Sequence, residues 1–220
     1  MITVTARLLK APGVVYASNR PVEVRDGSWN LANQRFNKPG EISNWTYVWV
    51  SPYRDLKSEP QQDVEQQKAK LDEHVTNFMK FQIGLGMTVS ARTNAGPTIM
   101  TKDPTKIDKM FGFMKQQKGI KWLLVILEEN DVPMYSAIKN AGDVKHGIKT
   151  VCVTRQKFSG INRGQYHQTG QLQYFGNVSL KFNLKAGGTN NLLLDGKDAP
   201  LRFIAENKTM IVSSLTNQFS

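Results

Sequence analysis

Residues 122–127 read WLLVIL, an apolar run that is bounded by Lys121 and Glu128. A strand that is apolar on both faces is typical of the middle of a parallel sheet, where helices cover the two sides. We therefore expect this run to be the central strand, with the other elements arranged around it.

Strands and helices are predicted to alternate on both sides of this run. Short runs rich in aromatic and β-branched residues indicate strands, which we place at residues 45–50, 87–90 and 148–153. Apolar residues at spacings of three and four, with Pro or Gly near the ends, indicate helices, which we place at 63–83, 103–118 and 133–145. The order β-α-β-α-β-α-β predicts an α/β fold, a Rossmann-like parallel sheet with helices on both faces.

Three segments are less regular. Residues 1–40 carry turn signals at short intervals between short apolar pieces, which predicts a linker that lies along a neighbouring domain. Residues 156–172 are polar and rich in Gly and Gln, and we expect a mobile loop. In residues 178–185 apolar residues alternate as in a strand, yet the segment also keeps helical spacing and is followed by Gly187 and Gly188. Periodicity alone leaves both alternatives open there.

The composition limits the classes of function. The 220 residues include 29 Lys and Arg against 18 Asp and Glu, a net charge of +11. Such a surplus favours a polyanionic partner, either nucleic acid or an anionic membrane surface. The single cysteine, Cys152, excludes an internal disulfide framework and a cysteine-based zinc finger. No apolar run is long enough for a transmembrane helix and no secretion signal is visible, so we expect a cytoplasmic protein without a membrane partner.

Common catalytic and cofactor motifs are missing from the sequence. The three histidines lie far apart, and neither a Walker A loop, a Gly-x-Gly-x-x-Gly fingerprint nor a Gly-x-Ser-x-Gly elbow occurs. We therefore expect neither a metal nor a cofactor.

Two pairs of side chains are candidates for binding an anion. Tyr135 and Lys139 stand four apart in the helix that follows the central strand, where doubly wound sheets bind ligands. A phenol and an ammonium group suit a phosphate, although solvated side chains without a ligand are the plainer alternative. Lys181 and Lys185 repeat the spacing. In a helix their Cβ atoms would be about 6 Å apart, and in a strand about 13 Å, so only a helix directs both charges at one anion.

Three blocks of sequence resemble, in order and spacing, the MID domain of eukaryotic Argonaute proteins. They read PMYSAIKNAGD at 133–143, GIKTVCV at 147–153 and NVSLKFNLKAGGTNN at 177–191. The run WNLANQRF at 29–36 resembles the linker that precedes MID in that family. Within the family the likeness is nearest to the quelling Argonaute of filamentous fungi.

The resemblance implies a function and a phosphate site. A MID domain of this family anchors the 5′-monophosphate and first nucleotide of a small guide RNA in RNA silencing. The phosphate-binding side chains of the family fall on Tyr135, Lys139, Lys181 and Lys185, with the tyrosine ring stacked on the first base and the two later lysines on a helix.

The resemblance also implies how the rest of the site is built. A glutamine that is usual in the family is replaced by Val151, and we expect Thr150 or the backbone of Cys152 to compensate for the lost donor. The loop before the helix is implied to read the first base through main-chain groups, at Asn130, Asp131, Val132 and Met134.

The domain division follows from the same resemblance. We expect a linker at 1–40, the MID domain at 41–200 and the start of a PIWI segment at 201–220. In slicing Argonautes a catalytic Asp follows the first PIWI strand, whereas here Ser213 follows TMIV at 209–212. We therefore expect no catalysis from this chain, and assign the acidic cluster around Glu128 to loop solvation or base approach. The implied partners are guide RNA, the PIWI and PAZ domains of the full-length protein, and silencing proteins.

Two other functions stay open at this point. A nucleotide-using α/β enzyme, such as a phosphatase or transferase, could work at the same strand end with Cys152, His146 or Asp143 as its reactive group. A protein-interaction domain with incidental basic charge is the third alternative.

Overall fold

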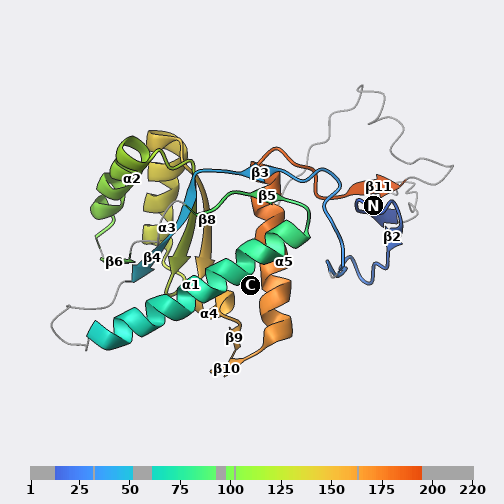
Figure 1. The fold of residues 1–220 in the computed structure, drawn as a ribbon, viewed down its shortest axis with the longest axis horizontal. Helices are drawn as coiled ribbons and strands as arrows, with labels where there is room; N and C mark the ends of the chain where they lie inside the picture. Colours follow the sequence, from blue (N-terminus) through green and yellow to red (C-terminus); the bar gives the residue numbers. More distant parts are fainter. Residues whose placement is uncertain are drawn as a thin grey trace, which may run out of the picture.

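A four-stranded parallel sheet lies between two layers of helices (Figure 1). The computed structural model describes residues 13–31, 33–51, 61–92, 98–101, 103–162 and 164–194. The strands follow the order β6 (Thr98–Met100), β4 (Trp45–Ser51), β7 (Trp122–Leu127) and β8 (Lys149–Thr154). In this register Trp122 pairs with Trp45 on one side and with Lys149 on the other. The apolar run at 122–127 is thus flanked by strands on both sides, as predicted.

Helices cover both faces of this sheet, which confirms the predicted fold class. On one face lie α1 (Gln61–Gly84) and α5 (Gln168–Lys185), and on the other lie α2 (Thr105–Lys118) and α3 (Val132–Lys139) (Figure 1). Leu124 and Ile126 of β7 belong to the core under α1 and α5, whereas Leu123 and Val125 belong to the core under α2 and α3. Because successive side chains of a strand point to opposite faces, a strand between two cores has to be apolar throughout.

The helix after the central strand changes its type. α3 continues directly into η1 (Asn140–His146), a seven-residue π-helix that ends at Gly147 in a left-handed conformation, with φ 63°. The predicted helix at 133–145 therefore has about the right extent, but its second half has a wider turn than an α-helix.

The segment expected to be a mobile loop is largely structured. It contains α4 (Arg155–Phe158), a hairpin of β9 (Ile161–Asn162) and β10 (Gln165–Tyr166), and the first turn of α5. Phe158 is fully buried, with its ring centroid 5.1 Å from that of Phe175. The buried Gln171 donates to the carbonyl of Phe158. These tertiary contacts order a segment that has no periodicity of its own, and α5 decides the ambiguity at 178–185 in favour of a helix.

The described residues between 13 and 40, which were expected to form a linker, pack against the rest of the described structure. β1 (Gly13–Val15) pairs with β2 (Pro21–Val22) and β11 (Leu192–Leu194), and β3 (Glu41–Ile42) pairs with β5 (Thr88–Val89). Tyr16 and Phe36 are buried in the same core as α1 and α5. The strand predicted at 87–90 is thus real but does not join the central sheet, because the short β5 pairs with β3 while β6 occupies the edge beside β4. The expected PIWI start at 201–220 lies outside the described residues.

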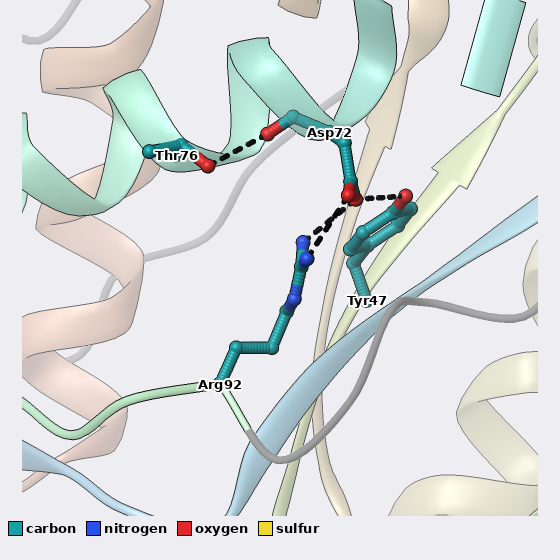
Figure 2. A network of polar contacts seen from close by, with 4 residues as sticks. All are labelled: Tyr47, Asp72, Thr76 and Arg92. Carbon is teal, nitrogen blue, oxygen red and sulfur yellow. Dashed lines mark hydrogen bonds and ion pairs between the residues drawn. The ribbon is translucent and has the colours of Figure 1, made fainter. Parts of the chain in front are cut away.

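A polar network ties α1 to the sheet. Arg92 donates to both carboxylate oxygens of Asp72, at 2.8 and 3.1 Å, and the Tyr47 hydroxyl donates to Asp72 at 2.5 Å (Figure 2). The guanidinium also lies 5.1 Å from the centroid of the Tyr47 ring. Three elements are thereby joined: β4, α1 and the segment that follows β5. In the described part of the chain, no helix is long and apolar enough to span a bilayer.

Candidate functional site

Two adjoining hollows lie beside β8, the outer strand of the described sheet. The first has a volume of about 490 Å³ and lies between the α3–η1 helix and α5. The second, of about 350 Å³, lies at the carboxyl ends of β7 and β8. Tyr135 and Cys152 line both hollows and so form the wall that they share.

The first hollow brings together the side chains predicted to bind phosphate. Its lining includes a phenol, a hydroxyl, a thiol and three ammonium groups from α3, β8 and α5, contributed by Tyr135, Lys139, Thr150, Cys152, Lys181 and Lys185. Val151, Leu184 and Asp143 complete the lining. All six predicted phosphate-site residues thus lie around one cavity.

Lys139 is held in place from β8. Its Nζ donates to the backbone oxygen of Thr150 at 2.9 Å and to Thr150 Oγ1 at 2.7 Å. An ammonium group has three N–H bonds, so one remains for a ligand. Burial lowers the pKa of Lys139, and Lys185 and Lys181 lower it further while Asp143 opposes them. An anion in the hollow would relieve this cost of keeping three positive charges together.

Lys181 and Lys185 lie one turn apart at the exposed end of α5 and line the same hollow. Lys149, although basic and close in sequence to the site, is engaged elsewhere. Its Nζ donates to the backbone oxygen of Lys185 at 2.9 Å and lies 4.5 Å from the centroid of the Trp122 ring. Lys149 therefore stabilises the carboxyl end of α5 and does not line the hollow.

The residues of β8 differ in what they offer to a ligand. The Thr150 side chain is fully buried, and its hydroxyl accepts from Lys139. Val151 is buried in the core under α5. Burial raises the pKa of the Cys152 thiol to about 11, so the thiol is neutral near pH 7. Because alternate residues of a strand direct their backbone groups to the same edge, the Cys152 N–H points to the side on which Thr150 O meets Lys139.

The second hollow contains three of the four loop residues predicted to approach the first base. Asn130, Asp131 and Val132 line it together with Tyr135, whereas Met134 does not. The Met134 side chain is buried under α2, and its N–H donates to Asp131 Oδ1 at 2.9 Å. Asp131 therefore caps α3, and the Met134 main chain donor is already used within the loop.

Several residues at the site were not predicted to bind the phosphate or the first base, although Asp143 was named as a candidate reactive group of an enzyme. Lys157, Thr154 and Tyr174 line the second hollow, and the first of them lies in the segment expected to be a loop. Asp143 and Leu184 line the first hollow. The spacing of Asp143, four residues after Lys139, was the signal that could have found it.

Glu128 has a defined contact that differs from the expected loop solvation. It accepts from Arg155 Nε at 2.7 Å and from the Trp49 indole N–H at 2.9 Å. This ion pair joins the ends of β7 and β8 beside the second hollow. Among the residues that the structure describes, no group of three or more His, Cys, Asp or Glu is arranged to hold a metal ion.

The protein is thus an α/β domain with a basic hollow beside the edge strand of its sheet, and comparisons with known proteins show what it resembles. A Piwi domain profile matches residues 122–214. Protein argonaute 5 of Arabidopsis thaliana is 24% identical over 220 residues, which cover 97% of this chain and 20% of that relative. The MID-PIWI domains of N. crassa QDE-2 AGO are 25% identical with a TM-score of 0.53, over 78% of this chain and 40% of that one.

Drosophila Piwi shares the fold, with a TM-score of 0.60 at 16% identity over 85% of this chain and 23% of that one. The chain is thus similar to Argonaute proteins in sequence, and to the MID-PIWI region of one of them in structure. It spans about a fifth of the length of the curated relatives that it matches.

Proposed function

We propose that this domain binds the 5′-monophosphate and first nucleotide of a small guide RNA. The observation that carries the proposal is the convergence of Lys139, Lys181 and Lys185 on one hollow beside Tyr135. In the described part of the chain, none of the three lysines forms an ion pair with a carboxylate. Similarity to Argonaute proteins supports the same role.

A terminal phosphate suits this hollow better than an internal one. A terminal monoester carries about −1.5 to −2 charges near pH 7, whereas an internal phosphodiester carries one. Three ammonium groups and the nearby carboxylate of Asp143 have a formal sum of +2, which matches the terminal group. Charge-assisted hydrogen bonds contribute on the order of 1.5–3 kcal/mol each. After the cost of association we expect a mononucleotide to bind with a dissociation constant of roughly micromolar to millimolar.

The second hollow suits the first base. The Tyr135 side chain is 46% exposed and separates the two hollows, so its ring can stack on a base while its hydroxyl reaches the phosphate. Stacking on an aromatic side chain is worth about 1–3 kcal/mol per base. The N–H of Cys152 at the open edge of β8 is our candidate for the donor that Val151 does not supply.

The enzymatic alternative has weaker support. A nucleophilic cysteine needs a thiolate, and burial raises the pKa of Cys152 to about 11. His146 and Asp143 do not line one hollow together, since His146 pairs with Asp108 at 2.9 Å on the α2 side. We therefore propose a binding module and not a catalyst.

The similarity to Argonaute proteins suggests a wider context. We propose that residues 1–40 are the linker before MID, 41–200 the MID domain and 201–220 the start of PIWI. The PIWI and PAZ domains of a longer polypeptide would then share the guide RNA, and silencing proteins in the cytoplasm would be further partners.

Titration of the 220-residue chain with a nucleoside 5′-monophosphate and with the matching nucleoside tests the proposal. We expect the monophosphate to bind at least about tenfold more tightly, as one charge-assisted contact provides. Equal affinities would contradict a phosphate site. Binding of 5′-phosphorylated RNA should weaken steeply with salt, which a protein-interaction domain with incidental charge would not show.

A further inference from the structure

Thr150 contacts two parts of the α3–η1 helix with its two branches. Its Oγ1 and backbone oxygen accept from Lys139 Nζ, as described above. Its methyl group, Cγ2, faces the backbone of Gly142, three residues further along the same helix. A single buried residue of β8 thus meets both the ammonium group and the backbone of the element that carries it.

Gly142 allows this close approach. A Cβ atom at position 142 would lie 2.7 Å from Thr150 Cγ2, 2.9 Å from the carbonyl oxygen of Ile148 and 3.2 Å from Phe111 Cε1. The carbonyl of Gly142 in turn accepts from the N–H of Ile148 at 2.9 Å. Since the obstacles include backbone and buried side chains, any residue larger than glycine has to push η1 away from β8.

We infer that Gly142 and Thr150 are positioning residues for the phosphate site, and this inference rests on the function proposed above. Neither residue has to touch the ligand. Together they set the distance between the helix and β8, and with it the position of the Lys139 ammonium group.

The physical advantage is preorganisation. A free lysine side chain loses rotamer freedom when it binds an anion, which lowers its affinity. Two acceptors on Thr150 already hold Nζ and leave one N–H for the hollow. The ordering cost is then met during folding and not during binding. Gly142 lies within the π-helix and Lys139 directly precedes it, and π-helical turns often occur at functional sites.

The first test is Gly142→Ala, with Gly84→Ala as the matched control. Gly84 ends α1 and does not have a positive φ, and a methyl group added there would meet no atom within 4 Å outside its own helix. We expect Gly142→Ala to weaken monophosphate binding about tenfold, which corresponds to the loss of one well-placed charged contact. Binding of the unphosphorylated nucleoside should change less than about twofold, and Gly84→Ala should leave both affinities unchanged.

A second substitution separates positioning from general damage. Thr150→Ser removes Cγ2, the nearest obstacle to the new methyl group, but keeps the hydroxyl that holds Lys139. In the Gly142→Ala background we expect it to restore part of the lost monophosphate affinity. Thr150→Val keeps the branched shape and removes the hydroxyl acceptor, so we expect it to reduce the monophosphate-to-nucleoside affinity ratio even with Gly142 intact.

The outcomes are distinct. A Gly142→Ala protein that melts at a lower temperature but keeps the wild-type affinity ratio would show a purely structural role and overturn the inference. Should that variant not fold, an unchanged ratio in Thr150→Val would overturn it equally. If the wild-type chain itself does not prefer the monophosphate, the proposed function fails first and the inference fails with it.

Discussion

The Asp72 network and the first hollow use charged side chains in opposite ways. At Asp72, a guanidinium and a phenol both donate to one carboxylate within the fold (Figure 2). In the first hollow, three ammonium groups come together, and none forms an ion pair with a carboxylate of the described residues. The first arrangement is complete without a ligand, whereas the second leaves donors available.

The difference separates stability from binding. Removing a partner from a matched network leaves a buried polar group unpaired, which costs folding free energy. Removing one of several like charges relieves their repulsion, which favours the folded state. The same change weakens the binding of an anion. Variants at the Asp72 network should therefore lower stability more than binding, and variants at the first hollow should lower binding more than stability.

The largest effect is expected for Lys139→Ala. Burial lowers the pKa of the Lys139 ammonium group, and Thr150 holds this group in place. Its loss should therefore weaken monophosphate binding about 10- to 100-fold. The melting temperature should change little, because the relief of repulsion among the ammonium groups offsets the two hydrogen bonds that the buried Thr150 loses. Calorimetric titration and thermal unfolding measure the two quantities. Lys149→Ala, the matched control, should have a smaller effect on binding, and the reverse ranking would mean that the hollow is not the phosphate site.

Asp72→Asn should show the opposite profile. It leaves Arg92 without its charged partner and should lower the free energy of unfolding by about 1–3 kcal/mol. Monophosphate affinity should stay within about twofold of the wild type. Denaturant unfolding gives the stability change, and Glu73→Gln, an exposed neighbour on α1, provides the control. A large loss of binding in Asp72→Asn would show that the two regions are not independent.

Asp143→Asn should sharpen the comparison by removing the acidic side chain of the first hollow. The remaining three ammonium groups would then act on a dianion without an opposing charge, and the affinity should rise about two- to fivefold. Titration with the monophosphate measures the change. Glu129→Gln removes an exposed acid that lines neither hollow and should have less effect. A weaker affinity in Asp143→Asn would show that Asp143 supports the site and does not oppose it.

The smallest effect concerns pH. Burial alone would raise the pKa of Asp72, but hydrogen bonds from Arg92 and Tyr47 outweigh it and lower the pKa below its usual range. A depressed carboxyl pKa stabilises the fold above the unfolded value of about 3.9 and loses this contribution as the pH falls through the folded value. The stability difference between wild type and Asp72→Asn should therefore be full at about pH 6 and shrink below about pH 4. A difference that stays constant into strong acid would contradict the assignment.

Much of the fold was accessible from local pattern. The strands at 45–50, 122–127 and 148–153 and the long helix at 63–83 were predicted within a few residues, because their apolar runs and periods are strong. The strand at 87–90 was found, but its partner was wrong, since two residues carry too little information to choose between sheet edges. The segment 156–172 was mistaken for a loop because its order comes from buried Phe158 and Gln171, which contact distant helices.

The candidate site divides in the same way. Tyr135 and Lys139 share one helix face, so their proximity follows from spacing alone. Lys181 and Lys185 could be joined to them only through resemblance to a family, because no local rule relates α5 to α3 across β8. Three contacts had no signal in the sequence. They are the hydrogen bond from Lys139 to Thr150, the close contact of Gly142 with β8 and the hydrogen bond from Lys149 to the end of α5.

The amino-acid sequence by itself determined the layered α/β architecture and the positive charge, because burial of apolar strands and the count of ionisable groups depend on composition and short-range order. Only the tertiary structure decided which ammonium groups line one hollow and which are hydrogen-bonded elsewhere in the fold. That choice depends on distances across the sheet between residues far apart in the chain, and on backbone contacts as close as that of Gly142 with β8.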